Sequence, residues 1–133
     1  MNKETLQKVK ELCQQFPQIK LAYFFGSRAT GKSGPMSDYD FAFYLDNIFN
    51  SKEIFLLKVD LQSKLTLILK TDNVDVVILN NIQKPLLGYN IIATGKLIYE
   101  IKPYKVIAEP KILNKYFDFK LSLEKNYLVK VKQ

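Results

Sequence analysis

The stretch that decides how this chain is interpreted reads Ser37-Asp38-Tyr39-Asp40-Phe41-Ala42-Phe43-Tyr44-Leu45. Its apolar half is typical of a β-strand, and residues two apart in a strand point to the same face, so we expect Asp38 and Asp40 to project together. Two carboxylates on one patch repel each other and lose hydration unless a cation lies between them. A hard divalent cation that prefers oxygen ligands, above all Mg²⁺, fits such a pair.

A tight turn comes shortly before this strand, in the motif Gly26-Ser27-Arg28. Backbone N–H groups in a turn of this kind can bind phosphate oxygens. Arg28 is the single arginine in a chain with 19 lysines, and its planar two-pronged guanidinium suits a phosphate, although chance placement is the alternative. Turn and carboxylates together predict a nucleotide that is held through its metal and its phosphates.

A third carboxylate, Asp75, lies within the β-branched run Val74-Asp75-Val76-Val77-Ile78-Leu79, which is also typical of a strand. An ionised Asp among valines is costly in a buried strand, so we expect Asp75 to face a site. Three carboxylates on neighbouring strands can hold two Mg²⁺ ions that clamp a phosphoryl group and lower the pKa of an attacking hydroxyl. Taken one at a time, each motif also has a structural interpretation: an ordinary turn, a solvent-facing strand and a structural ion pair.

The combination of Gly26-Ser27, the Asp38-x-Asp40 pair and the distal Asp75 resembles the nucleotidyltransferase superfamily of DNA polymerase β. The short length and the later stretches Gly95–Glu100 and Tyr116–Asp118 resemble its minimal branch, the MNT antitoxins that are paired with HEPN ribonuclease toxins. None of the three acidic positions departs from the pattern of the superfamily.

The resemblance implies a role for each residue of the motifs. Asp38 and Asp40 would bind both Mg²⁺ ions, and Asp75 would complete the second metal site and orient or deprotonate the acceptor hydroxyl. Gly26 and Ser27 would hold the phosphates, with Arg28 as a supplementary clamp. ATP would be the donor, AMP the transferred group, and a tyrosine hydroxyl of a HEPN toxin the acceptor, in a complex of toxin and antitoxin. Two alternatives are a transferase that modifies a small molecule such as an aminoglycoside, and a non-catalytic module that only binds a toxin.

Composition narrows the chemistry further. The chain has 133 residues, 47% of them hydrophobic, which fits a single globular domain over residues 1–133. It contains no histidine, which excludes a histidine base and a histidine-bearing zinc site, and its single cysteine, Cys13, reads as part of the core. The net charge of +7 is spread over the surface without the aromatic and basic pattern of an RNA-binding module, so we do not expect direct nucleic-acid binding. No apolar run is long enough to span a membrane, and a cytoplasmic protein is expected.

The order of helical and strand patterns predicts an α/β protein, specifically a two-layer α+β nucleotidyltransferase fold with a small mixed sheet flanked by helices. We expect strands over residues 19–25, 38–45, 74–79 and 97–99. Helices are expected over residues 3–15, 50–69 and 85–94, the second opened by a capping box of Asn50 and Glu53. A loop with Pro103 and Pro110 should lead to a C-terminal helix over about 111–128, whose excess of apolar residues leaves a partner surface as one interpretation.

Overall fold

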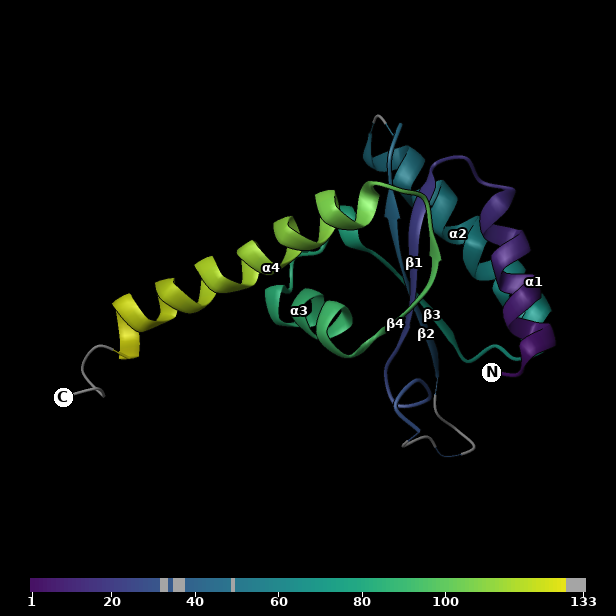
Figure 1. The fold of residues 1–133 in the computed structure, drawn as a ribbon, viewed down its shortest axis with the longest axis horizontal. Coiled ribbons are helices and arrows are strands. Elements are labelled where there is room, and N and C mark those ends of the chain that lie inside the picture. Colours follow the sequence, from purple (N-terminus) through teal and green to yellow (C-terminus); the bar gives the residue numbers. More distant parts are fainter. Residues whose placement is uncertain (32–33, 35–37, 49, 129–133) are drawn as a thin grey trace.

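The computed structural model describes residues 1–31, 34, 38–48 and 50–128. Helices and strands alternate along this part of the chain (Figure 1). The strands are β1 (Ile19–Phe25), β2 (Tyr39–Leu45), β3 (Val74–Ile78) and β4 (Lys96–Glu100). The α-helices are α1 (Lys3–Gln14), α2 (Ser51–Leu69), α3 (Pro85–Thr94) and α4 (Tyr104–Leu123). A 3₁₀ turn, η1 (Leu79–Asn81), follows β3, and a π-helical turn, η2 (Glu124–Leu128), follows α4.

The four strands form one mixed sheet in the order β3-β2-β1-β4. Strand β1 runs antiparallel to both of its neighbours, whereas β2 and β3 are parallel. The parallel pair needs a crossover, and α2 provides it. The predicted mixed α/β sheet is therefore confirmed, and the predicted strand positions agree with the observed ones to within one residue at each end.

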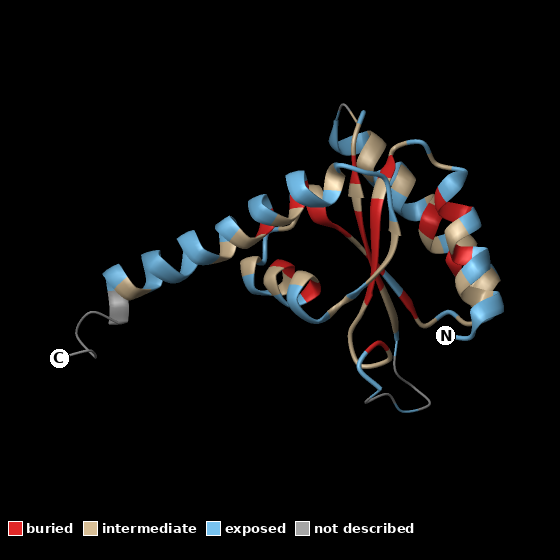
Figure 2. Ribbon diagram, in the orientation of Figure 1, coloured by how far each residue is buried: buried red, intermediate tan, exposed pale blue. Residues whose placement is uncertain are grey.

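Helices cover both faces of the sheet, which gives one layer more than the two that the sequence suggested (Figures 1 and 2). Helices α1 and α2 pack on one face, against the side chains of Phe41 and Phe43. Helices α3 and α4 pack on the other face, against Ala42 of the same strand. Successive residues of a strand point to opposite faces, so this continuous apolar strand supplies both cores at once.

Polar side chains or a proline fix the starts of three helices, and the Asn50 cap of α2 was predicted from the sequence. The side chain of Asn50 accepts a hydrogen bond of 2.9 Å from the backbone N–H of Glu53, which satisfies one of the free donors at the start of α2. Asn2 caps α1 in the same way, through a 2.7 Å bond from the N–H of Thr5. Pro85 opens α3, where its fixed φ and missing N–H are tolerated.

The prediction for the C-terminal helix was wrong in where it begins. Helix α4 starts at Tyr104 rather than near residue 111, and Pro110 lies inside it. Pro110 is exposed, while Ala108 and Ile112 on either side of it are buried against the sheet. The side chain of Glu109 also accepts a 2.6 Å hydrogen bond from the hydroxyl of Tyr23 on β1. These tertiary contacts outweigh the one backbone hydrogen bond that a proline removes from a helix.

Candidate active site

The candidate site lies at one end of the sheet, where β1 ends and β2 and β3 begin. Asp40 is the second residue of β2, and its strand neighbours are Phe25 on β1 and Asp75 on β3. The parallel register thus places Asp40 and Asp75 side by side, as the sequence predicted. Asp38 precedes β2 instead of belonging to it, because the strand begins at Tyr39, and it is exposed.

Both strand carboxylates belong to the sheet face that α3 and α4 cover. Ala42 lies two residues beyond Asp40, and Val77 lies two residues beyond Asp75; both pack in the core under α3 and α4. Side chains two apart share a face of a strand, so Asp40 and Asp75 open onto this side of the sheet. Asp40 is partly buried and Asp75 is exposed, which leaves the pair accessible to a ligand.

The three carboxylates influence one another electrostatically. Burial, followed by the negative charges of Asp75 and Asp38, raises the pKa of Asp40 from the usual 3.8 to about 6. Each of these causes disfavours the ionised form, and a cation bound between the carboxylates would reverse the effect of the two charges. Although Asp38 lies outside the strand, it therefore acts on the same group as Asp75 does.

Gly26 makes room for the Asp40 carboxylate. Its φ of +83° belongs to the left-handed region that glycine adopts without strain, and a Cβ at this position would lie 2.2 Å from Oδ2 of Asp40. The carbonyl oxygen of Gly26 accepts hydrogen bonds from the N–H groups of Ala29 and Thr30, at 3.1 and 3.2 Å. The turn that follows β1 is thus closed on itself, and Ser27 lies half-buried within it.

Arg28 occupies a position that sequence reasoning did not foresee. Its guanidinium carbon lies 4.1 Å from the centre of the Tyr39 ring, and that ring also stacks on Phe24 at 6.2 Å. Tyr39 packs on the sheet face covered by α1 and α2, the face opposite to Asp40. Sequence reasoning therefore missed the part that Tyr39 plays in holding the Arg28 side chain. The only sequence signal for this part is the position of Tyr39 between the two aspartates.

The donor set fits a hard divalent cation such as Mg²⁺. Carboxylate oxygens are the ligands that such ions prefer, two of the groups are strand neighbours, and the absence of a Cβ at Gly26 gives the Asp40 carboxylate its room. Among the residues that the structure describes, no three acidic, cysteine or histidine side chains converge tightly enough to form a ready-made metal cage. A cation bound between the carboxylates would offset their mutual repulsion. Ser37, the first residue of the second motif, lies outside the described residues.

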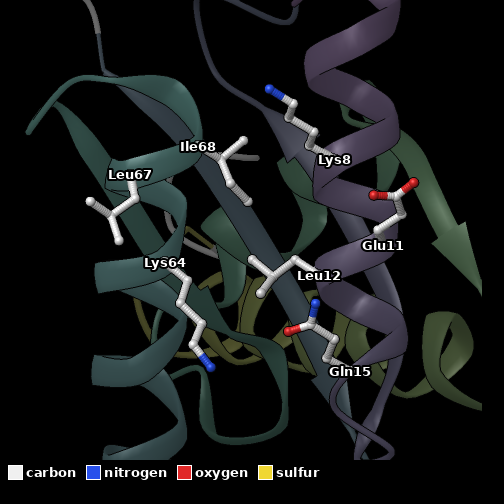
Figure 3. A pocket seen from close by; sticks show the side chains of 7 residues that line it. All are labelled: Lys8, Glu11, Leu12, Gln15, Lys64, Leu67 and Ile68. Carbon is white, nitrogen blue, oxygen red and sulfur yellow. The ribbon is translucent and has the colours of Figure 1, made fainter.

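A hollow of about 330 Å³ lies between α1 and α2 (Figure 3). Leu12, Leu67 and Ile68 contribute apolar side chains to it, and Lys64 lies at its edge. Lys64 is already engaged, by a 3.5 Å ion pair with Asp60 and by the ring of Phe16. This hollow is on the sheet face opposite to the carboxylates, so it is not part of the candidate active site.

Comparison with known proteins now identifies the family. Residues 7–104 match the family model described as polymerase beta, nucleotidyltransferase. This match covers more than half of the chain and includes both motifs and all three carboxylates. The chain therefore belongs to the polymerase β nucleotidyltransferase family.

One relative in sequence is a protein with a named activity. The chain is 32% identical over 96 residues to the protein adenylyltransferase MntA of Aphanizomenon flos-aquae, an alignment that covers 67% of this chain and 62% of MntA. The aligned part thus spans somewhat less than two thirds of that relative.

Solved structures show that the fold is shared over the full length. A chain from the crystal structure of a toxin–antitoxin with AMP-PNP matches with a TM-score of 0.75 and 21% identity, over 100% of both chains. A chain from the complex of the tri-AMPylated Shewanella oneidensis HEPN toxin with its MNT antitoxin matches with a TM-score of 0.72 and 19% identity, also over 100% of both chains. In the described part of the protein, no helix is both long and apolar enough to cross a membrane.

Proposed function

We propose that this protein transfers AMP from ATP to a tyrosine hydroxyl of a HEPN ribonuclease toxin, and that it acts as the antitoxin by doing so. The observation that carries the proposal is the meeting of Asp40 and Asp75 on adjacent strands, next to a turn in which only glycine fits. Family membership supports nucleotidyl transfer as the reaction class. The sequence relative, named as a protein adenylyltransferase, supports a protein acceptor.

The turn is the proposed site for the triphosphate. Gly26 and Ser27 would bind the β- and γ-phosphates through backbone N–H groups and the serine hydroxyl. Arg28 is assigned a supporting role as a clamp, which would require the guanidinium to leave or share the Tyr39 ring. The close approach of Gly26 to the Asp40 carboxylate would bring the phosphates near the acidic pair.

Asp38, Asp40 and Asp75 are the proposed ligands of two Mg²⁺ ions. When bound, Mg²⁺ neutralises charge on the triphosphate and lowers the pKa of an attacking hydroxyl. Asp38 and Asp40 would hold the ion that accompanies the triphosphate. Asp75, the more exposed member of the strand pair, would orient the acceptor hydroxyl and receive its proton.

In the transfer itself, the tyrosine oxygen attacks the α-phosphorus in line with the leaving group. A new bond forms between this oxygen and the α-phosphorus, and the bond from the α-phosphorus to the bridging oxygen of the β-phosphate breaks. The hydroxyl proton goes to the Asp75 carboxylate, and pyrophosphate leaves. Catalysis would come mainly from positioning and charge neutralisation, which fits a site that has no histidine. A cytoplasmic location follows from the proposed ATP donor and ribonuclease partner.

The experiment that tests the function is intact-mass spectrometry of the HEPN-type protein expected from the adjacent gene. The purified protein is incubated with this chain, ATP and Mg²⁺, and a mass increase of one AMP per modified tyrosine is expected. Asp75→Asn is expected to abolish the increase, whereas Asp60→Asn, a matched change of an aspartate on α2, should leave it intact. Neutralisation of the toxin without any mass increase would support the non-catalytic alternative. Transfer to an aminoglycoside but not to the protein would support the small-molecule alternative.

A further inference from the structure

Helix α4 consists of two halves with different surroundings. In the first half, Ala108 and Ile112 are buried against the sheet, and the hydroxyl of Tyr104 donates a hydrogen bond to Asp46. The second half runs on past α3 and away from the sheet (Figure 1). Its turns are exposed almost all round (Figure 2). This projecting half is the part of the described structure that lacks a packing surface of its own.

The apolar face that holds the first half to the protein continues into the projecting half. Side chains three or four residues apart share a helix face, and we call the following set the inner stripe. Its members are Tyr104, Ala108, Ile112, Tyr116, Phe119 and Leu123. Tyr116 stacks on Tyr89 of α3, with 4.4 Å between the ring centres. Beyond it, Phe119 is 42% exposed and Leu123 is 36% exposed, so the seam between α3 and α4 continues as an open apolar surface.

Lysines border this open surface on both sides. At about 100° per residue, Lys115 falls beside Phe119 on one edge of the inner stripe, and Lys120 falls beside Leu123 on the other edge. Both lysines are exposed. An apolar stripe between two positive edges is complementary to a helix whose apolar stripe has acidic residues on its edges. A second copy of this chain is a poor match, because it would bring the same lysines to the same seam.

The position of α4 links this surface to the candidate active site. The family match ends at Tyr104, the residue at which α4 begins. Helix α4 packs on the same sheet face as the one onto which Asp40 and Asp75 open. A protein held along the open end of the inner stripe therefore approaches from the side of the carboxylates.

We infer that the open end of the inner stripe, formed by Tyr116, Phe119 and Leu123, is the docking surface for the protein acceptor. The occupant is an apolar helix of that acceptor, with acidic residues facing Lys115 and Lys120. The stripe positions the acceptor and takes no part in the chemical step. The inference rests on the proposed function for the identity of the acceptor, but binding can be measured without transfer.

The test measures the dissociation constant between this chain and the purified HEPN-type protein in the absence of ATP. Phe119→Ser combined with Leu123→Ser is expected to weaken binding about 10- to 100-fold, since buried apolar anchors dominate interfaces. Leu121→Ser is the matched control, because Leu121 is 58% exposed on the opposite side of the same turns. It is expected to change the dissociation constant by less than about twofold. ATP affinity, measured in parallel, should be the same in all variants.

A second pair of variants tests the charges without removing any packing. Lys115→Glu combined with Lys120→Glu should weaken binding more at low salt than at high salt, whereas Lys52→Glu combined with Lys58→Glu, at exposed positions on α2, should not. Four outcomes would overturn the inference. The first is that the wild-type chain does not bind the HEPN-type protein, and the second is that Leu121→Ser weakens binding while the inner-stripe variant does not. The third is that charge reversal leaves the binding unchanged. The fourth is that sedimentation shows a homodimer, which the inner-stripe variant dissociates. Tight binding through this stripe without AMP transfer would contradict the proposed function alone.

Discussion

Replacing Asp40 by Asn should raise the stability of the metal-free protein while it abolishes nucleotide transfer. Burial and the charges of Asp75 and Asp38 raise the pKa of Asp40 from 3.8 to about 6, so the ionised carboxylate is less favourable in the folded protein than in the unfolded chain. A shift of this size corresponds to about 3 kcal/mol if the site were fully shielded. Because the side chain is only partly buried, solvent screening reduces this to about 1 kcal/mol.

The sign of the pH dependence follows from proton binding. Between pH 4 and pH 6 the folded protein binds the Asp40 proton more tightly than the unfolded chain does, so the free energy of unfolding falls as the pH rises through this window. Asn cannot ionise and does not suffer this loss. The stability of Asp40→Asn relative to wild type should therefore increase from pH 4 to about pH 7 and then level off. At neutral pH the difference should be about 1 kcal/mol, or about 3 to 5 °C in Tm.

The assay is chemical denaturation in EDTA at a series of pH values, and Asp46→Asn provides a control of opposite sign. A hydrogen bond from the hydroxyl of Tyr104, aided by the N–H of Asn47, lowers the pKa of Asp46. Its ionised form stabilises the fold at neutral pH, and this stability is lost as the pH falls. Asp46→Asn should thus destabilise the protein at pH 7 and have less effect at low pH. A pH-independent difference for Asp40→Asn, or one that decreases as the pH rises, would refute the proposed crowding of carboxylates.

Three further perturbations test the turn and its ligands. Gly26→Ala should lose activity and about 1 to 2 kcal/mol of stability, measured by denaturation, because its Cβ would meet the Asp40 carboxylate at 2.2 Å. Gly31→Ala is the control, since Gly31 has a similar φ of +79° but open space around it; equal loss of activity in both variants would argue against the contact. Arg28→Lys should weaken ATP binding several-fold in a titration if the guanidinium clamps phosphate, and unchanged affinity would leave Arg28 a structural role, such as its contact with Tyr39. Mg²⁺ and ATP together should raise the Tm by more than the sum of their separate effects, whereas additive shifts would contradict a shared site.

The central part of the fold could be predicted from sequence because its signals are local. Strands β1, β2 and β3 are continuous runs of apolar and β-branched residues, and each run is bounded by a turn or a proline. The pairing of Asp40 with Asp75 needed one more step, the expectation that their strands are neighbours. That step was inferred from the chemistry of three carboxylates that share a metal site, because strand order in a sheet depends on contacts that are distant in the sequence.

The start of α4 could not be predicted in the same way, because it depends on tertiary contacts. Pro110 is normally a helix breaker, and a loop over residues 103–110 follows from local propensity alone. What keeps this segment helical is the burial of Ala108 and Ile112 and the hydrogen bond from Tyr23 to Glu109, none of which is visible in a local window. The contact of Arg28 with Tyr39 was missed for the same reason, since it joins the turn to the opposite sheet face.

The stability lost at Asp40 and the proposed binding of a cation are two consequences of one arrangement. The register that sets Asp40 beside Asp75 is also the register that buries Phe41 and Phe43 under α1 and α2, so the core holds the carboxylates together against their repulsion. A ligand that removes this repulsion regains the part of the lost energy that comes from the two neighbouring charges, which favours binding by less than about 1 kcal/mol because burial is the larger cause of the loss. The benefit of Mg²⁺ to stability should therefore be smaller in Asp40→Asn than in the wild-type protein, even though the variant is the more stable of the two without metal. An equal benefit in both proteins would mean that the cation binds somewhere other than between these strands.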